Sequence, residues 1–375
     1  MRALRYQVVI KRKATGMGIE YGVKNGALLW IRNPFTGAVV YFNDIHLKPH
    51  SFRRLTNTSS PNPAPPALSP ETFHREAQRV QRACVFCPGN EAQTMHEVMR
   101  LSYGDIYALE ALPNGCAADD WAMRVIHNIV PRIPEVCTGG RNESYVIMED
   151  ARHFLPAATG LGDVMWSGAL PAAHFEQTLR LATRVIRHSM DNPAVQSVLI
   201  RKHQGRESGA SQPHIHMQVI GADRIFPDVE REIETTARAP EIWSESVDLM
   251  HTFGFQLEAG DGIVTQWSSF GHFSRHFEVI SLEDWQPLTA ISERRLRLFS
   301  QYAHRLLRAL GPSPYDLEIH HGESIPLHLH LNARRYVYAN IGGTLNAPSD
   351  LAEHALPPTR EMVQSLAQCM RDAQG

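Results

Sequence analysis

Two histidines and a glutamine alternate along one short segment of the chain. His214, His216 and Gln218 are separated by apolar residues, and a turn of small residues at 209–211 precedes them. Because side chains alternate between the two faces of a β-strand, this spacing places the three polar side chains on one face. Such a face needs water, a metal or an anionic ligand as its partner. The turn presents backbone N–H groups, which suit a phosphate.

A pair of cysteines lies upstream of this strand, at Cys84 and Cys87, and a Pro-Gly pair follows it. Two thiolates on such a tight turn can share one tetrahedral zinc ion. A redox-active pair is the usual alternative for this spacing, but no thioredoxin-like pattern surrounds these residues. A zinc site needs two further ligands, and histidines are the natural supply. His214 is one candidate, and spacing alone leaves the other open between His153 and His127.

The order of predicted elements recurs along the chain. A strand, a long helix and a second strand lead to a corner at His203, and the His-x-His strand at His214 follows. The same order leads to a corner at His320 and to a His-x-His strand at His328. This recurrence predicts an internal duplication of one strand–helix–strand–strand unit. The mixture of helices and strands in each copy predicts the α+β fold class.

The composition is that of an ordinary globular protein. The 375 residues include 43% hydrophobic and 20% charged residues, and the net charge is −2. A near-neutral chain has no general attraction to nucleic acid or to anionic membranes, so neither is an expected partner. No apolar run approaches the length of a membrane span, and the N-terminus has no signal-peptide core. Five cysteines, with one close pair, argue against a secreted disulfide framework and predict a cytoplasmic protein.

These motifs, in this order, resemble the galactose-1-phosphate uridylyltransferase family of the histidine-triad superfamily. The resemblance covers most of the chain, from about residue 32 to about residue 348. It is carried by Arg-Asn-Pro-Phe-Thr-Gly at 32–37, Cys-x-x-Cys-Pro-Gly-Asn at 84–90, Arg-Val-Ile-His-Asn at 124–128, the segment 209–218 and His-Leu-His at 328–330. It implies two tandem histidine-triad-like α+β repeats with a mainly antiparallel sheet.

The resemblance and the duplication together predict four parts of the chain. Residues 1–54 are a β-rich N-terminal segment expected to pack on the first repeat, and residues 55–70 are a loop rich in proline and serine. Residues 71–240 form the first histidine-triad-like repeat, which carries the zinc knuckle and the active site. Residues 241–375 form the second histidine-triad-like repeat, which is expected to be catalytically silent.

The resemblance also implies roles for particular residues. His216 is the nucleophile, and Gln218 holds the transferred phosphoryl group. The ligands of a structural zinc ion are Cys84, Cys87, His153 and His214. A second metal, zinc or iron, is expected at Glu232, His320, His328 and His330. Nucleotide or phosphate contacts are expected from Ser211, Asn128, Gly205, His203 and Lys48.

The chain departs from the family pattern at several places. His203 stands where the family has asparagine, and Ile45 stands where it has the first of two basic residues, the other being Lys48. The central motif is His-Ile-His instead of His-Pro-His, closer to the dinucleoside polyphosphate phosphorylases of the superfamily. Residues 336–343 lack the acidic residue of the family's galactose-contacting segment, so galactose 1-phosphate is expected to be a poor acceptor.

The expected activity is transfer of a nucleoside monophosphate between a nucleotide sugar and a sugar phosphate, through a nucleotidyl-His216 intermediate. In the resembling superfamily, hydrolases carry a third histidine at the position of Gln218, whereas transferases carry glutamine. One alternative is a phosphorylase or hydrolase of nucleotide sugars or dinucleoside polyphosphates that uses the same histidine. The other is a zinc-stabilised binding protein whose active site has lapsed. The resemblance also suggests a homodimer.

The second repeat lacks parts of this machinery. Matching the two His-x-His strands residue by residue aligns His328 and His330 with His214 and His216. In this alignment Asn332 replaces the glutamine, and no Gly-Ala-Ser turn precedes the strand. The second repeat is therefore expected to act as a scaffold.

Overall fold

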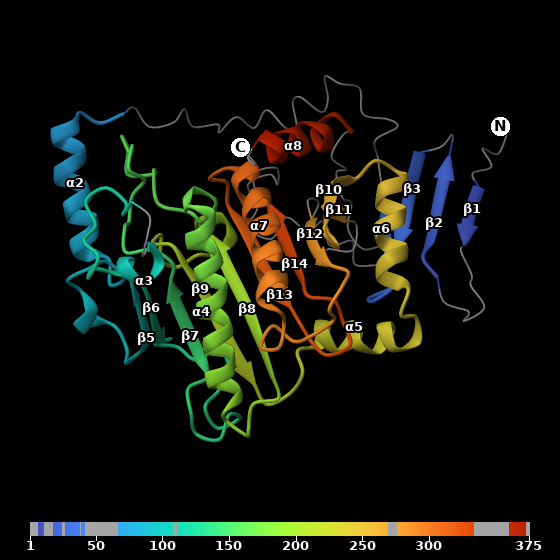
Figure 1. The fold of residues 1–375 in the computed structure, drawn as a ribbon, viewed down its shortest axis with the longest axis horizontal. Coiled ribbons are helices and arrows are strands. Elements are labelled where there is room, and N and C mark those ends of the chain that lie inside the picture. Colours follow the sequence, from blue (N-terminus) through green and yellow to red (C-terminus); the bar gives the residue numbers. More distant parts are fainter. Residues whose placement is uncertain are drawn as a thin grey trace. The chain divides into compact units, whose positions relative to one another are not determined.

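The computed structural model describes residues 7–10, 18–24, 27–37, 39–41, 67–107, 111–268, 276–333 and 360–372 (Figure 1). The chain divides into two compact units: residues 59–226 form the first unit, and residues 1–58 with 227–375 form the second unit. Three sequence predictions concern residues outside the described ranges: Lys48, the segment 336–343 and most of the loop 55–70. Among the described residues, no helix has both the length and the apolar composition needed to cross a membrane.

The first unit is built on five antiparallel strands in the order β8-β9-β7-β6-β5. They are β5 (Glu97–Ser102), β6 (Trp121–His127), β7 (Ser144–Met148), β8 (Ser197–Gln204) and β9 (His216–Ala222). Every residue of β7 and β9 is buried, as is all of β6 except His127. These three strands therefore form a rigid centre from which polar side chains can be held in fixed positions.

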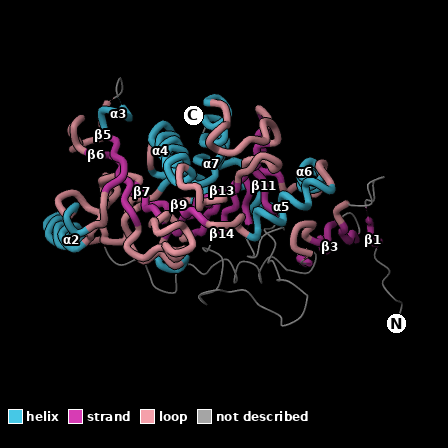
Figure 2. The backbone as a smooth tube through the Cα atoms, turned by 90° about the horizontal axis from the view of Figure 1, so that it is seen from below, coloured by secondary structure: helices cyan, strands magenta, loops and turns pink. Residues whose placement is uncertain are grey.

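Two of the helices of the first unit pack on one face of these strands. The helical segments are α2 (Pro70–Ala83), α3 (Tyr103–Tyr107), α4 (Ala172–Met190) and the short 3-10 turns η1 (Glu91–Gln93), η2 (Ser167–Ala169) and η3 (Arg206–Ser208). The buried residues of α4 include Leu181, Val185 and Ile186, and the helix packs on β7, β8 and β9. Figure 2 shows α3 and α4 on the same side of the sheet. The opposite face is free of these two helices.

Helix α2 delivers the first cysteine of the chain to the interior. The Ser69 hydroxyl caps the helix by accepting from the Thr72 N–H at 3.3 Å, and Pro70 occupies the first turn, where its missing N–H costs nothing. The helix ends at Ala83, and Cys84 follows as an extended C-cap residue. Local capping chemistry thus fixes where this cysteine lies.

The second unit repeats the architecture of the first. Its five antiparallel strands have the order β13-β14-β12-β11-β10. They are β10 (Gln256–Gly260), β11 (Ile263–Ser268), β12 (His276–Ser281), β13 (Tyr315–His320) and β14 (His328–Ala333). The chain order β12-α7-β13-β14 matches β7-α4-β8-β9 of the first unit. The predicted α+β fold class, with a mainly antiparallel sheet and a duplicated unit, is confirmed.

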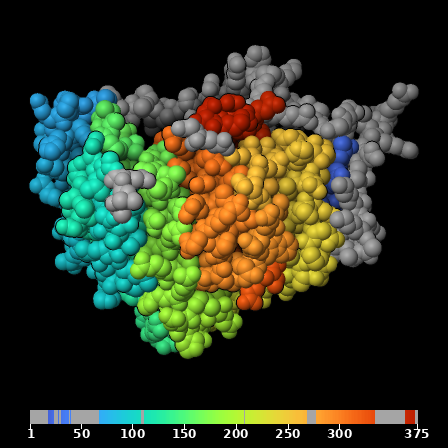
Figure 3. Space-filling view, viewed as in Figure 1, coloured from blue at the N-terminus to red at the C-terminus, as the bar shows by residue number. Residues whose placement is uncertain are grey.

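Four helices belong to the second unit among the described residues. They are α5 (Pro227–Arg238), α6 (Ile242–Thr252), α7 (Glu293–Leu310) and α8 (Arg360–Asp372). Helix α7 packs on β11 and β12, and α8 packs on α7 and β10. The side chains of α7 (orange) and α8 (red) lie at the surface in Figure 3. Helix α7 therefore takes the place that α4 has in the first unit.

The N-terminal strands form a separate antiparallel sheet in the order β1-β2-β3-β4. They are β1 (Gln7–Ile10), β2 (Glu20–Lys24), β3 (Ala27–Arg32) and β4 (Val39–Tyr41). The ring centroids of Tyr21 and Phe253 are 5.9 Å apart, and those of Phe35 and Trp243 are 4.9 Å apart. These contacts tie the sheet to the end of α6 and to α6 itself. The sequence analysis instead expected the N-terminal segment on the first repeat, and a boundary at residue 240 where the units divide at 226.

Candidate active site and metal-binding clusters

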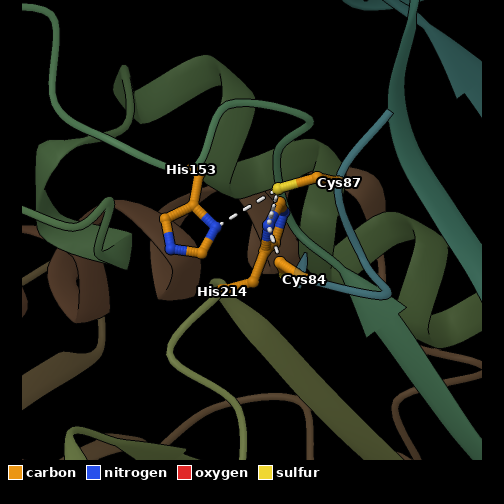
Figure 4. A group of neighbouring side chains, drawn as sticks. All are labelled: Cys84, Cys87, His153 and His214. Carbon is orange, nitrogen blue, oxygen red and sulfur yellow. Dashed lines mark hydrogen bonds between the residues drawn. The ribbon is translucent and has the colours of Figure 1, made fainter. Parts of the chain in front are cut away.

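Two cysteines and two histidines lie together in the interior of the first unit, and Figure 4 shows them as one group. Cys84 caps α2, Cys87 lies in the turn that follows, His153 lies in the loop after β7, and His214 precedes β9. The Cys87 sulfur is 3.3 Å from His153 Nδ1 and 3.5 Å from His214 Nδ1. The Cys84 sulfur is 3.8 Å from His214 Nδ1. All four side chains are buried, so distant parts of the chain converge on one point.

This arrangement fits a tetrahedral metal ion. Zinc–sulfur bonds of about 2.3 Å and zinc–nitrogen bonds of about 2.0–2.1 Å place sulfur and nitrogen about 3.6 Å apart. His214 Nε2–H donates to the main-chain carbonyl of Asp150 at 2.8 Å, which turns the Nδ1 lone pair toward the thiols. The hydrogen bond from Cys87 lowers the pKa of the Cys84 thiol, favouring the thiolate that binds metal. The cluster can therefore hold a metal ion.

Sequence spacing left the fourth ligand of this cluster open between His153 and His127, and the structure distinguishes the two. His153 Nδ1 faces the Cys87 sulfur, so His153 belongs to the cluster. His127 ends β6 instead, where its ring centroid lies 5.0 Å from that of Tyr145. The ligand set implied by the family resemblance is thus the set that the fold brings together.

His216 begins β9 with a defined ring orientation. Its Nδ1–H donates to the main-chain carbonyl of His214 at 2.8 Å, so the lone pair lies on Nε2. Burial lowers the pKa of His216 to about 4, and the charge of Lys202 adds to this effect. The Phe86 ring meets the imidazole edge-on, with centroids 5.5 Å apart. At neutral pH His216 is therefore an uncharged imidazole with Nε2 available as a nucleophile.

A pocket of about 280 Å³ has His216 in its wall. Three other predicted site residues also line it: Gln218, Ser211 and Asn128. The remaining lining side chains are Val85, Phe86, Met95, Ile126, Ile129 and Val146, which are apolar, with Gln93, Thr94, His127 and Gln212. The apolar wall suits a flat ring, and the amide and hydroxyl groups suit an anion beside the nucleophile.

Two other predicted contact residues, His203 and Gly205, are absent from the lining of this pocket. On β8, Arg201 pairs with Gln218, so His203 lies two residues further along the same face, toward His216. The charge of His203 contributes to lowering the pKa of His216. Gly205 adopts a left-handed φ of +81° that favours glycine, and its carbonyl accepts from the Ala210 N–H at 3.2 Å. Gly205 therefore shapes the turn that carries Ser211.

The sequence analysis missed a buried ion pair behind the strand of His216. Lys202 Nζ binds the carboxylate of Glu149 and also lies 3.2 Å from the main-chain oxygen of His216. The Ser167 hydroxyl donates to the other Glu149 oxygen at 2.8 Å. The sequence contained a signal for this pair. Lys202 occupies a position of β8 whose side chain points to the buried face, where an apolar residue is expected.

The second predicted cluster lies in the second unit. It consists of Glu232 on α5, His320 at the end of β13, and His328 and His330 on β14. Both Glu232 oxygens are 3.0 Å from His320 Nδ1, and one is 3.3 Å from His328 Nε2 and 3.5 Å from His330 Nε2. Although burial opposes ionisation, the positive charges of His320 and His328 hold the pKa of Glu232 well below its usual range. This donor set can also hold a metal ion.

The hydrogen bonds of the two units correct the internal alignment. His328 Nδ1–H donates to the carbonyl of Pro326 at 2.8 Å, as His216 Nδ1–H does to the carbonyl of His214. His328 is therefore the counterpart of His216, and the residue-by-residue match of the two His-x-His strands was wrong by two positions. The physical reason is that a shift of two residues keeps every side chain on the same face of a strand, so alternation cannot detect it.

Under the corrected alignment, His330 is the counterpart of Gln218, and a proline stands at the place of His214. Both units thus use the same strand-start geometry, and they differ in the side chains around the imidazole.

Known structures share this fold. The chain is similar to an ADP-glucose phosphorylase from Arabidopsis thaliana solved with bound ADP-glucose, with 14% identity, 92% of this chain and 98% of that chain covered, and a TM-score of 0.60. It is similar to a galT-like protein from Arabidopsis thaliana, with 14% identity, the same coverage of 92% and 98%, and a TM-score of 0.58. A uridylyltransferase structure is 16% identical over 69% of this chain and 91% of that chain, with a TM-score of 0.55.

At these identities the likeness shows the fold, and the predicted galactose-1-phosphate uridylyltransferase-like fold is confirmed. No curated protein matches the chain by sequence. A family model matches residues 114–334, more than half of the chain, and the chain therefore belongs to the family described as Domain of unknown function (DUF4921).

Proposed function

We propose that this protein is a nucleotidyltransferase that moves a nucleoside monophosphate between a nucleotide sugar and a sugar phosphate through His216. One observation carries the proposal: an uncharged imidazole, held by its Nδ1–H, lies in the wall of a pocket with its Nε2 free of hydrogen bonds to described residues. Gln218, Ser211 and Asn128 line the same pocket. A nucleophile, amide donors and a hydroxyl are the groups that phosphoryl transfer requires.

The reaction proceeds in two in-line steps. In the first, the Nε2 lone pair of His216 attacks the α-phosphorus of the donor, an N–P bond forms, and the P–O bond to the leaving sugar phosphate breaks. The ring becomes positively charged, and the carbonyl of His214 stabilises that charge by accepting from Nδ1–H. In the second step, a phosphate oxygen of the acceptor attacks the same phosphorus, and the N–P bond breaks.

Two polar side chains bear the charge on the transferred group. The Gln218 amide N–H and the Ser211 hydroxyl, both in the pocket wall, donate to the phosphoryl oxygens. A low pKa suits His216 for both steps, because the ring is uncharged when it attacks and is a good leaving group when it departs. The site can therefore serve donor and acceptor in turn.

We assign the Cys84, Cys87, His153 and His214 cluster to structural zinc. When bound, zinc would join α2, the loop after β7 and the start of β9, and four protein ligands leave no open position for substrate. His214 links this cluster to the nucleophile, because its carbonyl orients the His216 ring. The Glu232, His320, His328 and His330 cluster is assigned to a second structural metal, zinc or iron.

The alternative is a phosphorylase, in which inorganic phosphate takes the nucleotidyl group from the same histidine. It is favoured by the similarity, over 92% of this chain, to the structure named ADP-glucose phosphorylase. The two activities share the first step and differ only in the acceptor. Phosphate and hexose phosphates are therefore the substrates that separate them.

The test is covalent labelling followed by acceptor competition. The protein is incubated with UDP-glucose or ADP-glucose, and peptide mass spectrometry looks for an acid-labile nucleotidyl group on His216. The labelled protein is then offered inorganic phosphate, glucose 1-phosphate or galactose 1-phosphate, and the product is identified. We expect label on His216 and its release by a phosphate acceptor. If neither donor, nor any other nucleotide sugar in a panel, labels His216, the proposal is wrong.

A further inference from the structure

The Lys202–Glu149 ion pair is fully enclosed, with exposed side-chain fractions of 1% and 0%. Removing two charges from water costs free energy, and apolar residues of similar volume often serve stability as well. A buried pair is therefore weak evidence for a stabilising role and calls for another explanation. The pair lies directly behind the strand of the proposed nucleophile, because Lys202 Nζ also donates to the main-chain oxygen of His216 at 3.2 Å.

The pair joins the two chain segments that build the site. Glu149 directly follows β7, and its N–H donates to the carbonyl of Ile215 at 3.2 Å. Its carbonyl accepts from His174 Nε2 at 2.7 Å, and its carboxylate accepts from Ser167 and from Lys202. The segment after β7 and the start of β9 are thus cross-linked through both backbone and side-chain bonds.

Lys202 lies on the face of the sheet opposite to the pocket. Arg201 is directly across from Gln218, so the next residue of β8 projects to the other side, which α4 covers. Lys202 is accordingly absent from the described lining of the pocket. It cannot touch a substrate there, and any effect on the reaction must pass through the backbone of His216.

We infer that Lys202, held by Glu149, is a positioning residue that fixes the main chain of His216 so that Nε2 meets the α-phosphorus; this inference rests on the proposed nucleotidyl transfer. His216 is then held at two points. Lys202 Nζ donates to its main-chain carbonyl, and its own Nδ1–H donates to the carbonyl of His214. A displacement of about 1 Å at a reacting atom can cost roughly 100-fold in rate. The expected effect falls on the chemical step and spares donor binding.

The test replaces the pair without leaving a buried charge. The double variant Glu149→Leu with Lys202→Met removes the bond to the His216 carbonyl and keeps an apolar filling of similar size. We expect the rate constant for labelling of His216 to fall roughly 10- to 100-fold, with the dissociation constant for the donor within about twofold of the unaltered protein. A second double variant, Glu149→Gln with Lys202→Gln, should show the same loss, because glutamine is shorter than lysine and leaves the carbonyl unbound.

The control is a partly buried ion pair in the second unit, with exposed side-chain fractions of 15% and 11%. Arg305 Nη2 lies 2.7 Å from Glu258 Oε1, and both residues belong to the second unit, whereas His216 belongs to the first. The variant Glu258→Leu with Arg305→Met should label at the unaltered rate. The inference is overturned if His216 is labelled at the unaltered rate in a folded Lys202 variant. It is also overturned if the control variant loses as much of the labelling rate as the Lys202 variants do.

A measurement without substrate separates this inference from the proposed function. Imidazole ¹⁵N NMR reports which ring nitrogen of His216 carries the proton, and we expect the unaltered protein to show one Nδ1–H tautomer. Both Lys202 double variants should show a mixture of tautomers, and the control should not. If the unaltered protein labels with no donor, the proposed function fails, and the NMR result alone decides whether Lys202 positions the ring. An unchanged tautomer in the variants would refute the positioning role.

Discussion

His216 and His328 begin equivalent strands, and each ring donates Nδ1–H to the carbonyl two residues earlier at 2.8 Å. The difference lies at the other ring nitrogen. In the first unit His216 lines a pocket. In the second unit Nε2 of His328 lies 3.3 Å from the carboxylate of Glu232. One strand geometry therefore places an imidazole in two different surroundings, and under the proposed function the neighbouring side chains decide between nucleophile and ligand.

The electrostatics of the two regions diverge accordingly. Burial lowers the pKa of His216 to about 4, and among the described residues no carboxylate bonds its ring. In the second unit burial likewise lowers the pKa of His328, the counterpart of His216, whereas at His320 the charge of Glu232 outweighs burial and raises the pKa to about 10. An uncharged ring serves attack on phosphorus, and a charged or metal-bound ring serves cohesion. This division of roles between the two units can be tested at four points.

The largest effect is expected from removing the two equivalent histidines separately. His216→Ala should lower nucleotidyl transfer by at least about a thousandfold, because the covalent intermediate cannot form. His328→Ala should lower thermal stability while His216 is still labelled by the donor. Labelling kinetics and thermal unfolding of both variants provide the measurement. Equal loss of labelling in the two variants would contradict the division of roles.

The second point is the metal cluster of the first unit. Structural zinc contributes roughly 10 kcal/mol or more of folding free energy, so Cys84→Ser or His153→Ala should lower Tm by more than about 10 °C. Metal content by plasma mass spectrometry should fall in parallel. His127→Ala is the control, because His127 lies outside the cluster and its loss should leave metal content unchanged. Normal zinc content in His153→Ala would mean that another residue is the ligand.

The third point exchanges a residue between the two units. Gln218→His installs the residue that the second unit carries at the equivalent position, His330. A histidine there adds a general acid–base group, so hydrolysis of the donor relative to transfer should rise about tenfold or more. His330→Gln is the reciprocal variant, and it should cost stability while leaving that ratio unchanged. Product analysis by mass spectrometry measures the ratio, and an unchanged ratio in Gln218→His would remove Gln218 from the control of reaction type.

The smallest effect is expected from pH. Because the pKa of His216 is lowered to about 4, the ring loses its proton well below neutrality. The labelling rate should therefore rise with pH through about 4 and stay level between about pH 5.5 and 8. An inflection near the ordinary histidine value of about 6.5 would show that His216 is less buried than the structure indicates. The rate of His216 labelling, measured at a series of pH values from about 4 to 8, distinguishes the two outcomes.

Local signals in the sequence determine much of this fold. Ser69 and Pro70 mark the start of α2 by capping chemistry, and the alternation from His214 to Gln218 marks a strand with one polar face. The recurrence of the strand–helix–strand–strand order revealed the duplication. Family motifs added His153 as the candidate ligand that spacing had left open, and the structure brings it to the cluster.

Other features depend on contacts that a linear pattern does not contain. The alignment of His216 with His328 needs hydrogen bonds, because alternation is unchanged by a shift of two residues. The partner of Lys202 lies 53 residues away in sequence, so its burial could be suspected but its role could not. The placement of the N-terminal strands follows from ring contacts such as Phe35 with Trp243, which only the tertiary fold creates.

The carbonyl that orients each imidazole belongs to the main chain, and this has an evolutionary consequence. Every amino acid supplies that oxygen, so the residue two positions before the imidazole can differ while the ring keeps its hydrogen bond: His214 provides it in one unit and Pro326 in the other. After a gene duplication, one copy can exchange this histidine for proline and keep an aligned imidazole ready for a new partner. Divergence of the two halves then requires few coordinated substitutions, because the most demanding part of the geometry is encoded by the backbone.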